Sequence, residues 1–259
     1  MSSSEIAIEV RDLTKRFGDF VANDHISIQI RNGEVHGLLG ENGAGKTTMM
    51  NMLSGILQPT SGEILVHGKP VHLASAKDAT ELGIGMVHQH FMLVENFTVL
   101  ENIMLGVEET KGVGILNRHD AKAKVVALSK QYGLDVDPDA KVADISVGMQ
   151  QRAEILKVLY RNADILIFDE PTAVLTPQEI KELLDIFRRL ASEGKAVILI
   201  SHKLNELQAV ADITTIIRRG KVIDTVDTKT TSTEKLAELM VGRHVTFQRQ
   251  RVPMPVGPE

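Results

Sequence analysis

The chain has 259 residues, a formal charge of −5 and 43% apolar residues, which suits a globular protein with a sizeable core. Its acidic balance argues against a nucleic-acid binder that relies on a basic surface. The absence of cysteine excludes disulfides, cysteine-ligated zinc, iron–sulfur clusters and a thiol nucleophile. No run approaches the roughly 20 apolar residues of a membrane span, and the N-terminus lacks the features of a signal peptide.

The first 75 residues predict paired strands around a glycine-rich turn. Alternating apolar and polar residues in 6–10 and 26–30 favour half-exposed antiparallel strands. Asn32-Gly33 favours a hairpin turn that leads into an apolar strand at 35–39. A glycine-rich turn then precedes a helix from Thr47 to about Leu53. A further hairpin is expected from 63–67 and 71–73 around Gly68.

The remainder of the chain predicts an α/β fold. Residues 91–162 are mostly helical in pattern, and a capping box at Thr98-x-x-Glu101 supports this. Strict alternation follows, and it implies right-handed crossovers and a buried parallel sheet. The expected elements are strand 164–169, helix 177–192, strand 196–201, helix 203–210, paired strands 213–218 and 221–226, and a helix opened by Thr231-x-x-Glu234.

Residues 40–48 predict a phosphate-binding loop. The pattern G-x-x-x-x-G-K-[ST] is matched by Gly40-Glu41-Asn42-Gly43-Ala44-Gly45-Lys46-Thr47-Thr48, between an apolar strand and a helix. Glycines let backbone N–H groups converge on phosphate oxygens, and the helix N-terminus adds partial positive charge. We expect Lys46 to contact the β- and γ-phosphates and the Thr47 hydroxyl to ligate Mg²⁺. The alternative is a glycine-rich turn that happens to contain Lys-Thr.

Two carboxylates end the apolar strand Ile165-Leu166-Ile167-Phe168. Parallel sheets place ligands at the carboxyl edge of their strands, which is where Asp169 and Glu170 fall. Asp169 would hold Mg²⁺, and Glu170 would accept a proton from an attacking water or orient that water. Taken alone, the pair also suits an acidic turn that Pro171 terminates.

The final residues have a different composition. Three of the eight prolines lie in the last seven residues, after Arg249 and Arg251, which is typical of a linker. We interpret 246–259 as a linker-like tail from which the natural polypeptide continues. An ordinary frayed C-terminus is the alternative.

Three further motifs complete a set that resembles the nucleotide-binding subunit of an ABC transporter. They are Gln89 after Met86-Val87-His88, the stretch 145–152, and His202 at the end of a strand. The resemblance covers about residues 5–245 and implies a P-loop NTPase fold. That fold has a mostly parallel central sheet, an N-terminal antiparallel β-subdomain and an inserted helical subdomain. It divides an ATPase domain of residues 1–245 into a core (1–90 and 163–245) and a helical subdomain (91–162).

The resemblance also implies a role for each matching position. Phe17 would stack on adenine, where tyrosine is more usual, and Gln89 would reach Mg²⁺ and the attacking water. His202 would contact the γ-phosphate. The implied ATP-binding residues are Phe17, Gly40, Glu41, Asn42, Gly43, Ala44, Gly45, Lys46, Thr47, Thr48, Ser146, Gly148 and Gln150; the catalytic residues are Lys46, Gln89, Glu170 and His202; and the Mg²⁺ residues are Thr47, Gln89 and Asp169.

Several of these residues have a structural alternative. Phe17 suits a core aromatic, Gln89 a polar residue at a strand end, and His202 a satisfied histidine at a strand terminus. Ser146 is also an expected N-cap for the helix that follows, a role compatible with phosphate binding.

Two departures from the family pattern stand out. The signature sequence, usually LSGGQ, has Val147 and Met149 where the family has glycine and glutamine. After the acid pair, Thr176 replaces an aspartate that normally helps to couple two sites across a dimer. Thr176-Pro177 with Glu179 instead forms a capping box. This replacement puts the symmetry of the two sites in question.

The resemblance implies that two such domains sandwich each ATP, and that Ser146 and Gly148 serve the ATP of the other domain. The second domain is either a tandem domain or a second copy. Implied partners are membrane permease subunits, which we expect to dock near residues 91–94, and indirectly a solute-binding lipoprotein. The chain would then lie at the cytoplasmic face of the membrane.

The amino-acid sequences of these motifs resemble those of the family branch that imports nucleosides and simple sugars. Members of that branch typically carry two ATPase domains. Competing hypotheses are a non-transport ABC-type ATPase acting on DNA or ribosomes, and a nucleotide-binding module with little hydrolysis of its own. The acidic charge and the absence of long heptad runs argue against the first. Glu170 and His202 argue against the second.

Overall fold

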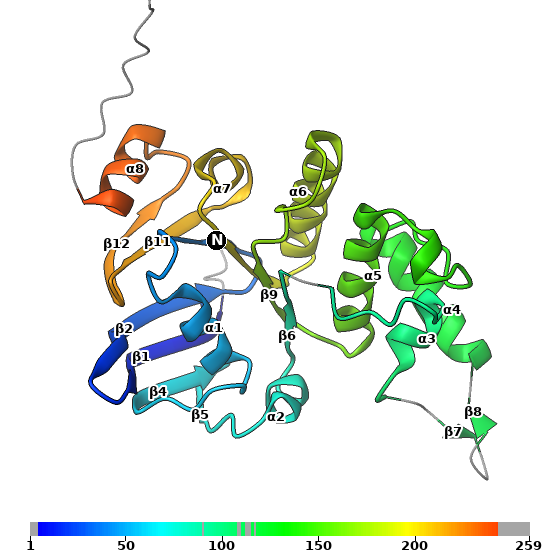
Figure 1. Cartoon of the computed structure of the whole chain (residues 1–259). Helices are drawn as coiled ribbons and strands as arrows, with labels where there is room; N and C mark the ends of the chain where they lie inside the picture. The colour runs from blue at the N-terminus through cyan, green and yellow to red at the C-terminus, as the bar shows by residue number, and fades with distance from the viewer. Residues whose placement is uncertain (1–4, 90, 108–109, 112–114, 117, 243–259) are drawn as a thin grey trace, which may run out of the picture.

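The computed structural model describes residues 5–89, 91–107, 110–111, 115–116 and 118–242, and the predicted tail 246–259 lies outside them. Two sheets form the centre of the molecule (Figure 1). An antiparallel sheet has the order β2-β1-β4-β5. Its strands are β1 (Ile6–Phe17), β2 (Phe20–Arg31), β4 (Ser61–Val66) and β5 (Lys69–Val71).

The second sheet has six strands in the order β12-β11-β3-β10-β9-β6. Its neighbours are parallel except for the β11–β12 pair. This confirms the predicted α/β class with a mostly parallel sheet. The strands are β3 (Val35–Leu39), β6 (Ile84–Val87), β9 (Ile165–Asp169), β10 (Ala196–Ser201), β11 (Ile213–Arg218) and β12 (Lys221–Asp227).

The Asn32-Gly33 turn does not form the predicted hairpin. β2 pairs with β1 in the antiparallel sheet, whereas β3 pairs with β10 and β11 in the other. Every residue of β3 is buried. A strand buried on both faces belongs in the middle of a parallel sheet, so the turn passes the chain from one sheet to the other.

Helices cover the six-stranded sheet, and the cores on its two faces are distinct. In β9, Leu166 and Phe168 join one buried cluster while Ile165 and Ile167 join the other, as strand alternation requires. The second cluster also takes in buried residues of the antiparallel sheet and of α1. The helices of this part are α1 (Lys46–Leu53), α2 (Ala76–Glu81), α6 (Pro177–Ser192), α7 (Leu204–Val210) and α8 (Thr233–Val241).

The last of these helices begins one residue later than predicted. Ser232, not Thr231, is its N-cap, and the Ser232 hydroxyl accepts from the backbone N–H of Lys235. The Thr231 hydroxyl instead donates to the carbonyl of Asp227.

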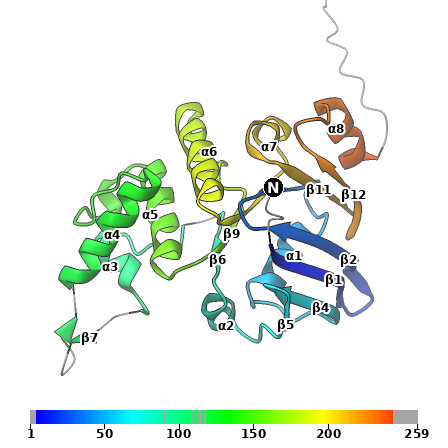
Figure 2. The ribbon, with the colours of Figure 1, turned by 180° about the vertical axis from the view of Figure 1, so that it is seen from behind.

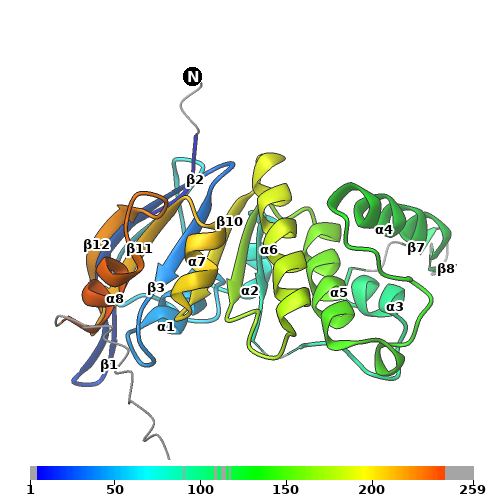
Figure 3. The ribbon, with the colours of Figure 1, turned by 90° about the horizontal axis from the view of Figure 1, so that it is seen from above.

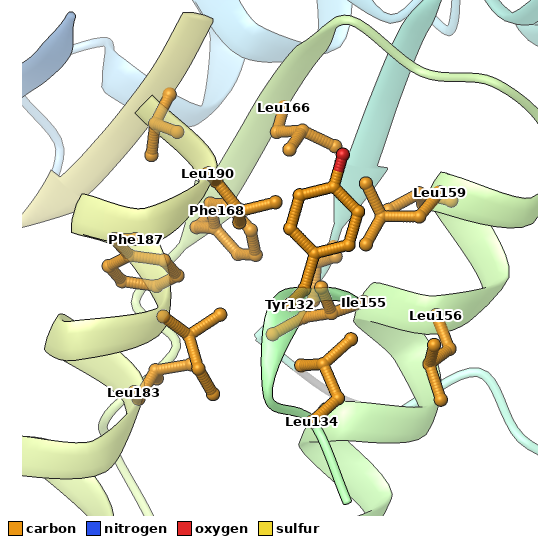
Figure 4. Packing of buried hydrophobic residues seen from close by; sticks show 14 of the residues in the cluster. Tyr132, Leu134, Ile155, Leu156, Leu159, Leu166, Phe168, Leu183, Phe187 and Leu190 are labelled. Atoms are coloured by element: carbon orange, nitrogen blue, oxygen red, sulfur yellow. The ribbon is translucent and has the colours of Figure 1, made fainter. Parts of the chain in front are cut away.

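The helical region lies beside α6, at the opposite end of the molecule from α8 (Figures 2 and 3). Phe168 and Phe187 pack there with ring centroids 4.4 Å apart, and Tyr132, Leu134 and Ile155 lie next to them (Figure 4). This apolar contact ties the region to the strand that ends in the acid pair. Its elements are α3 (Val99–Met104), the short β7 (Thr110–Lys111) and β8 (Ile115–Leu116), α4 (Arg118–Tyr132), a 3₁₀ turn (Val142–Asp144) and α5 (Val147–Tyr160).

The predicted division into core segments 1–90 and 163–245 and a helical subdomain 91–162 stays a proposal for the described parts of those ranges. Within the described residues, no helix combines the length and apolar character needed to cross a membrane.

Candidate functional site

A cavity of about 520 Å³ lies where the glycine-rich loop meets the carboxyl ends of the parallel strands. It brings together residues that are far apart in the sequence: the loop, Gln89 two residues after β6, the acid pair at the end of β9, and His202 directly after β10. Its lining residues are Phe20, Ala22, Asn42, Gly43, Ala44, Gly45, Lys46, Thr47, Thr48, Gln89, Asp169, Glu170, Ala173 and His202.

The loop presents the N-terminus of α1 to this cavity. Gly45 is the N-cap, with φ 102°, and no side chain caps the helix. The first turn carries no acidic residue. Uncapped N–H groups and the helix dipole favour an anion at this end, so the loop fits a polyphosphate.

Lys46 is a buried cation within the loop. Its Nζ donates to the carbonyls of Gly40 (2.6 Å) and Glu41 (3.0 Å), which uses two of the three donors of an ammonium group. Burial lowers its pKa, and the carboxylates of Glu170 and Asp169 oppose that shift. The remaining donor suits a ligand oxygen, and an added negative charge would offset the cost of burial.

Neighbouring strands support the loop from behind. The side chain of Asn23, fully buried on β2, donates from Nδ2 to the carbonyl of Gly45 (3.1 Å). In the β11–β12 turn, the N–H of Gly220 donates to the carbonyl of Ala44 (2.9 Å). Asn23 belongs to no recognisable motif, and its only signal in the sequence is a polar residue in an otherwise apolar strand position.

Asp169 and Thr47 form the candidate Mg²⁺ site. A hydrogen bond joins their side chains, and Asp169 is buried at the end of β9. Burial raises the pKa of Asp169, and the nearby Glu170 adds to the effect. No group of three or more His, Asp or Glu residues suited to a metal occurs in the described chain. One carboxylate and one hydroxyl nevertheless fit Mg²⁺, because this ion usually keeps several waters and takes oxygens from substrate phosphates.

Glu170 and His202 form a hydrogen-bonded pair at the rim. The Nδ1 of His202 lies 2.9 Å from Oε1 of Glu170, and the side chains are 50% and 12% exposed respectively. Glu170 adopts φ 47°, an unusual conformation for a residue with a side chain. Its N–H donates to the carbonyl of Ile200 on the adjacent strand. Such strain costs about 1–3 kcal/mol and concentrates at functional sites.

Two of the loop residues and the predicted aromatic do not line the cavity. Gly40 lies behind the loop, where its Cα faces the carbonyl of Ile217. Glu41 lines a separate cavity of about 230 Å³ with Arg218 and Arg219. Phe17 is half-exposed at the β1–β2 turn, while Phe20, which we did not single out from the sequence, lines the 520 Å³ cavity.

The predicted signature residues Ser146, Gly148 and Gln150 lie elsewhere. They belong to the start of α5, which lies across α6 from α1 (Figures 1 and 3). The Ser146 hydroxyl caps α5 by accepting from the N–H of Met149, as predicted. Gln150 donates to the carbonyls of Val142 and Ile145. One chain therefore does not bring this motif to its own phosphate loop.

Glu179 contacts the N-terminus of α6 and also the N-terminus of α5, where the signature motif lies. Its carboxylate accepts from the N–H and the hydroxyl of Thr176, completing the predicted capping box of α6. The backbone of Gly148 also donates to it. Bonds to Thr176 are the main reason that the pKa of Glu179 is low. A Cβ at position 148 would lie 2.5 Å from Oε1 of Glu179, so a larger residue there would have to displace this carboxylate.

Comparison with known proteins agrees with this geometry. Residues 23–173 match the family model described as ABC transporter. The solved structure of MJ1267, an ATP-binding cassette in its ADP conformation, matches with a TM-score of 0.79 and 23% identity, covering 91% of this chain and 95% of that one. CbiO1 from Clostridium perfringens matches with a TM-score of 0.76 and 29% identity, covering 87% and 90%.

Two relatives have higher identity. The nucleoside import ATP-binding protein NupA of Lactococcus lactis subsp. cremoris is 61% identical, covering 95% of this chain and 48% of NupA. The guanosine import ATP-binding protein NupO of Bacillus subtilis is 56% identical, covering 98% of this chain and 50% of NupO. The chain thus spans about half the length of the curated relatives it matches. From the family match and the fold, we conclude that the chain belongs to the ABC transporter family.

Proposed function

We propose that this chain binds MgATP and hydrolyses it to power the import of a small polar solute through a membrane permease. The observation that carries the proposal is the single cavity that joins the phosphate loop, the acid pair, Gln89 and His202. These residues come from four separate segments, and only the fold brings them together.

The proposed roles follow from the geometry. Lys46 and the first N–H groups of α1 would bind the β- and γ-phosphates. Thr47 and Asp169 would hold Mg²⁺, which stabilises the phosphate charge when bound, and Gln89 would complete the site. Glu170 would accept a proton from the attacking water. His202 would hold the Glu170 carboxylate in place and contact the γ-phosphate.

A second ATPase domain is part of the proposal. Ser146, Gly148 and Gln150 are remote from the cavity of their own chain, so we assign them to an ATP bound by a second domain. The double length of NupA and NupO supports a tandem arrangement, in which this chain corresponds to the first domain. A second copy of this chain is the other arrangement that would complete the site.

We propose that the permease docks beside α2 and β6. A cavity of about 220 Å³ there is lined in part by Ile56 and Met92, which are 51% and 61% exposed. The segment after Gln89 is also tied to α5, because the N–H of Met92 donates to Glu154 (2.7 Å) and its carbonyl accepts from Lys157 (3.1 Å). A displacement of this segment would therefore shift both Gln89 and the helical region.

The proposed solute is a nucleoside or a simple sugar. The names of NupA and NupO support a nucleoside as the solute. A glucose import ATP-binding protein of Haloferax volcanii is 44% identical to this chain and supports a sugar as the alternative. Import by such a system would place the chain at the cytoplasmic face of the cell membrane. A solute-binding lipoprotein would deliver the solute to the permease.

ATP turnover by matched variants tests the proposal. Lys46→Ala should abolish MgATP binding measured by calorimetry. Glu170→Gln should keep that binding and slow hydrolysis by about 10² or more, the scale of losing a positioned base. Lys235→Ala and Glu238→Gln, on the remote helix α8, should leave both unchanged. Full binding by Lys46→Ala, or full turnover by Glu170→Gln, would refute the corresponding role.

A further inference from the structure

Three polar side chains form a hydrogen-bonded cluster next to the Glu170–His202 pair. Thr172 lies two residues after Glu170. Lys203 directly follows His202, and Glu206 lies in the first turn of α7. Thr172 and Glu206 are buried, with 1% and 8% of their surfaces exposed. None of the three lines the 520 Å³ cavity, so contact with the nucleotide does not explain this group, the Thr172 cluster.

The hydrogen bonds of the Thr172 cluster fix the orientation of its central hydroxyl. The Thr172 hydroxyl donates to Oε2 of Glu206 (2.7 Å) and accepts from Nζ of Lys203 (3.1 Å). The same ammonium donates to the carbonyl of Thr172 (3.2 Å) and lies 3.1 Å from Oε1 of Glu206. A hydroxyl has one donor, and the carboxylate takes it. Because both partners are charged groups at a largely buried place, these bonds are stronger than those between neutral groups in water.

The Thr172 cluster connects the two chain segments that carry Glu170 and His202. Thr172 belongs to the turn after β9, whereas Lys203 is the N-cap of α7 and Glu206 lies within that helix. Glu170 has φ 47°, and a strained backbone of this kind persists only where its surroundings hold it. The fixed position of Thr172 therefore restrains the chain two residues beyond the strained residue.

The direct contact between Glu170 and His202 is the weaker restraint of the two. The His202 side chain is 50% exposed, so water competes for its hydrogen bond to the carboxylate of Glu170. Pairs of this kind at a surface contribute little to stability. The bond between Thr172 and Glu206 meets less competition from water, because both residues are buried. The buried bond therefore fixes the relative position of the two segments more firmly than the exposed contact does.

We propose that Thr172 and Glu206 are positioning residues for Glu170, and that their hydrogen bond holds the Glu170 carboxylate beside His202. The inference rests on the proposed role of Glu170 as the base for the attacking water. Neither residue contacts the nucleotide, and both act through the backbone between residues 170 and 172. Loss of the bond should slow hydrolysis and leave the affinity for MgATP unchanged, because the phosphate loop belongs to a separate segment.

Steady-state hydrolysis by threonine variants tests the proposal. Thr172→Val keeps the branched shape of the side chain and removes the hydroxyl. It should lower kcat by about 10- to 100-fold, because a displacement of about 1 Å can cost about 10²-fold, and calorimetry should find an unchanged affinity for MgATP. Thr172→Ser, which keeps the hydroxyl, should restore kcat. Thr228→Val is the matched control with unchanged kcat, because it removes a buried hydroxyl that bonds to Thr214 (2.7 Å) outside the cavity.

A double variant shows whether the effect passes through Glu170. In the Glu170→Gln background the base is already lost, so Thr172→Val should cause no further loss of kcat. Glu206→Ala should reproduce the effects of Thr172→Val in both backgrounds. Three results would overturn the positioning role: an equal loss in both backgrounds, a normal kcat in Thr172→Val, or a fall in MgATP affinity that matches the fall in kcat.

Crystal structures of the nucleotide-free parent and Thr172→Val separate this inference from the proposed function. The distance between Oε1 of Glu170 and Nδ1 of His202 is 2.9 Å here, and in the variant it should exceed about 3.5 Å. An unchanged distance would overturn the inference and leave the role of Glu170 unaffected. Hydrolysis by Glu170→Gln at the parent rate would overturn the role of Glu170, and the distance would still decide the positioning role. Glu206→Ala gives the same measurement in a second variant, should Thr172→Val fail to fold.

Discussion

Substitutions at three glycines of the phosphate loop can distinguish two causes of destabilisation, backbone strain and steric crowding. Gly43 has φ 78°, and a Cβ there would meet nothing within 4 Å. Gly40 has no such φ, but its Cβ would lie 2.4 Å from the carbonyl oxygen of Ile217. Gly45 combines φ 102° with a Cβ 2.5 Å from the carbonyl oxygen of Ala22. Alanine at each position therefore tests one cause or both.

The magnitudes follow from these contacts. Gly43→Ala carries only the left-handed backbone penalty, about 1–2 kcal/mol, part of which the reduced freedom of the unfolded chain offsets. Gly40→Ala carries an overpacking cost of about 1–3 kcal/mol because a backbone carbonyl cannot rotate away. Gly45→Ala adds both and disturbs the Asn23 hydrogen bond, so we expect about 3–5 kcal/mol.

Urea unfolding of the nucleotide-free variants measures these free energies without any contribution from ligand binding. The expected order of destabilisation is Gly45→Ala, then Gly40→Ala, then Gly43→Ala. A loss in Gly43→Ala as large as that in Gly45→Ala would refute the reasoning, because it would show that the surroundings of Gly45 do not constrain the loop.

Two further predictions concern charged groups. Burial raises the pKa of the Asp169 carboxyl, so the folded state binds the carboxyl proton more tightly than the unfolded chain does. As the pH rises from the ordinary carboxyl pKa to the raised pKa of Asp169, the carboxyl ionises and the free energy of unfolding falls. Asp169→Asn should therefore have a higher urea midpoint than the parent at pH 7.5, with a smaller difference in acid; a pH-independent difference would contradict this. Gly148→Ala should displace the Glu179 carboxylate and cost about 1 kcal/mol, the scale of a lost cap. The cost should fall in a Glu179→Ala background, and equal costs in both backgrounds would show that the two residues do not interact.

The sequence predicted those features that depend on local pattern. Helix α6 and strand β10 have the predicted bounds, since a capping box with Pro177 and a run of buried apolar residues leave little choice. The phosphate loop and the acid pair line one cavity, as the order of strand, loop and helix implied.

Features that depend on distant pairing were not predictable in this way. Asn32-Gly33 satisfies the preference for a hairpin turn, yet the burial of β3 between β10 and β11 decides its partners. The contact between Glu179 and Gly148 joins positions 31 residues apart, and no short motif reports it. The position of Phe20 could have been predicted from the sequence, because a two-residue turn after Phe17 places Phe20 opposite it.

A crystal structure of the Glu170→Gln variant with MgATP tests the central claim most directly. Slow hydrolysis should preserve the triphosphate, and we expect its β- and γ-phosphates at the N–H groups of residues 43–48, with Mg²⁺ beside Thr47 and Asp169. Nucleotide density at another surface of the chain, with this loop contacting no phosphate, would contradict the account.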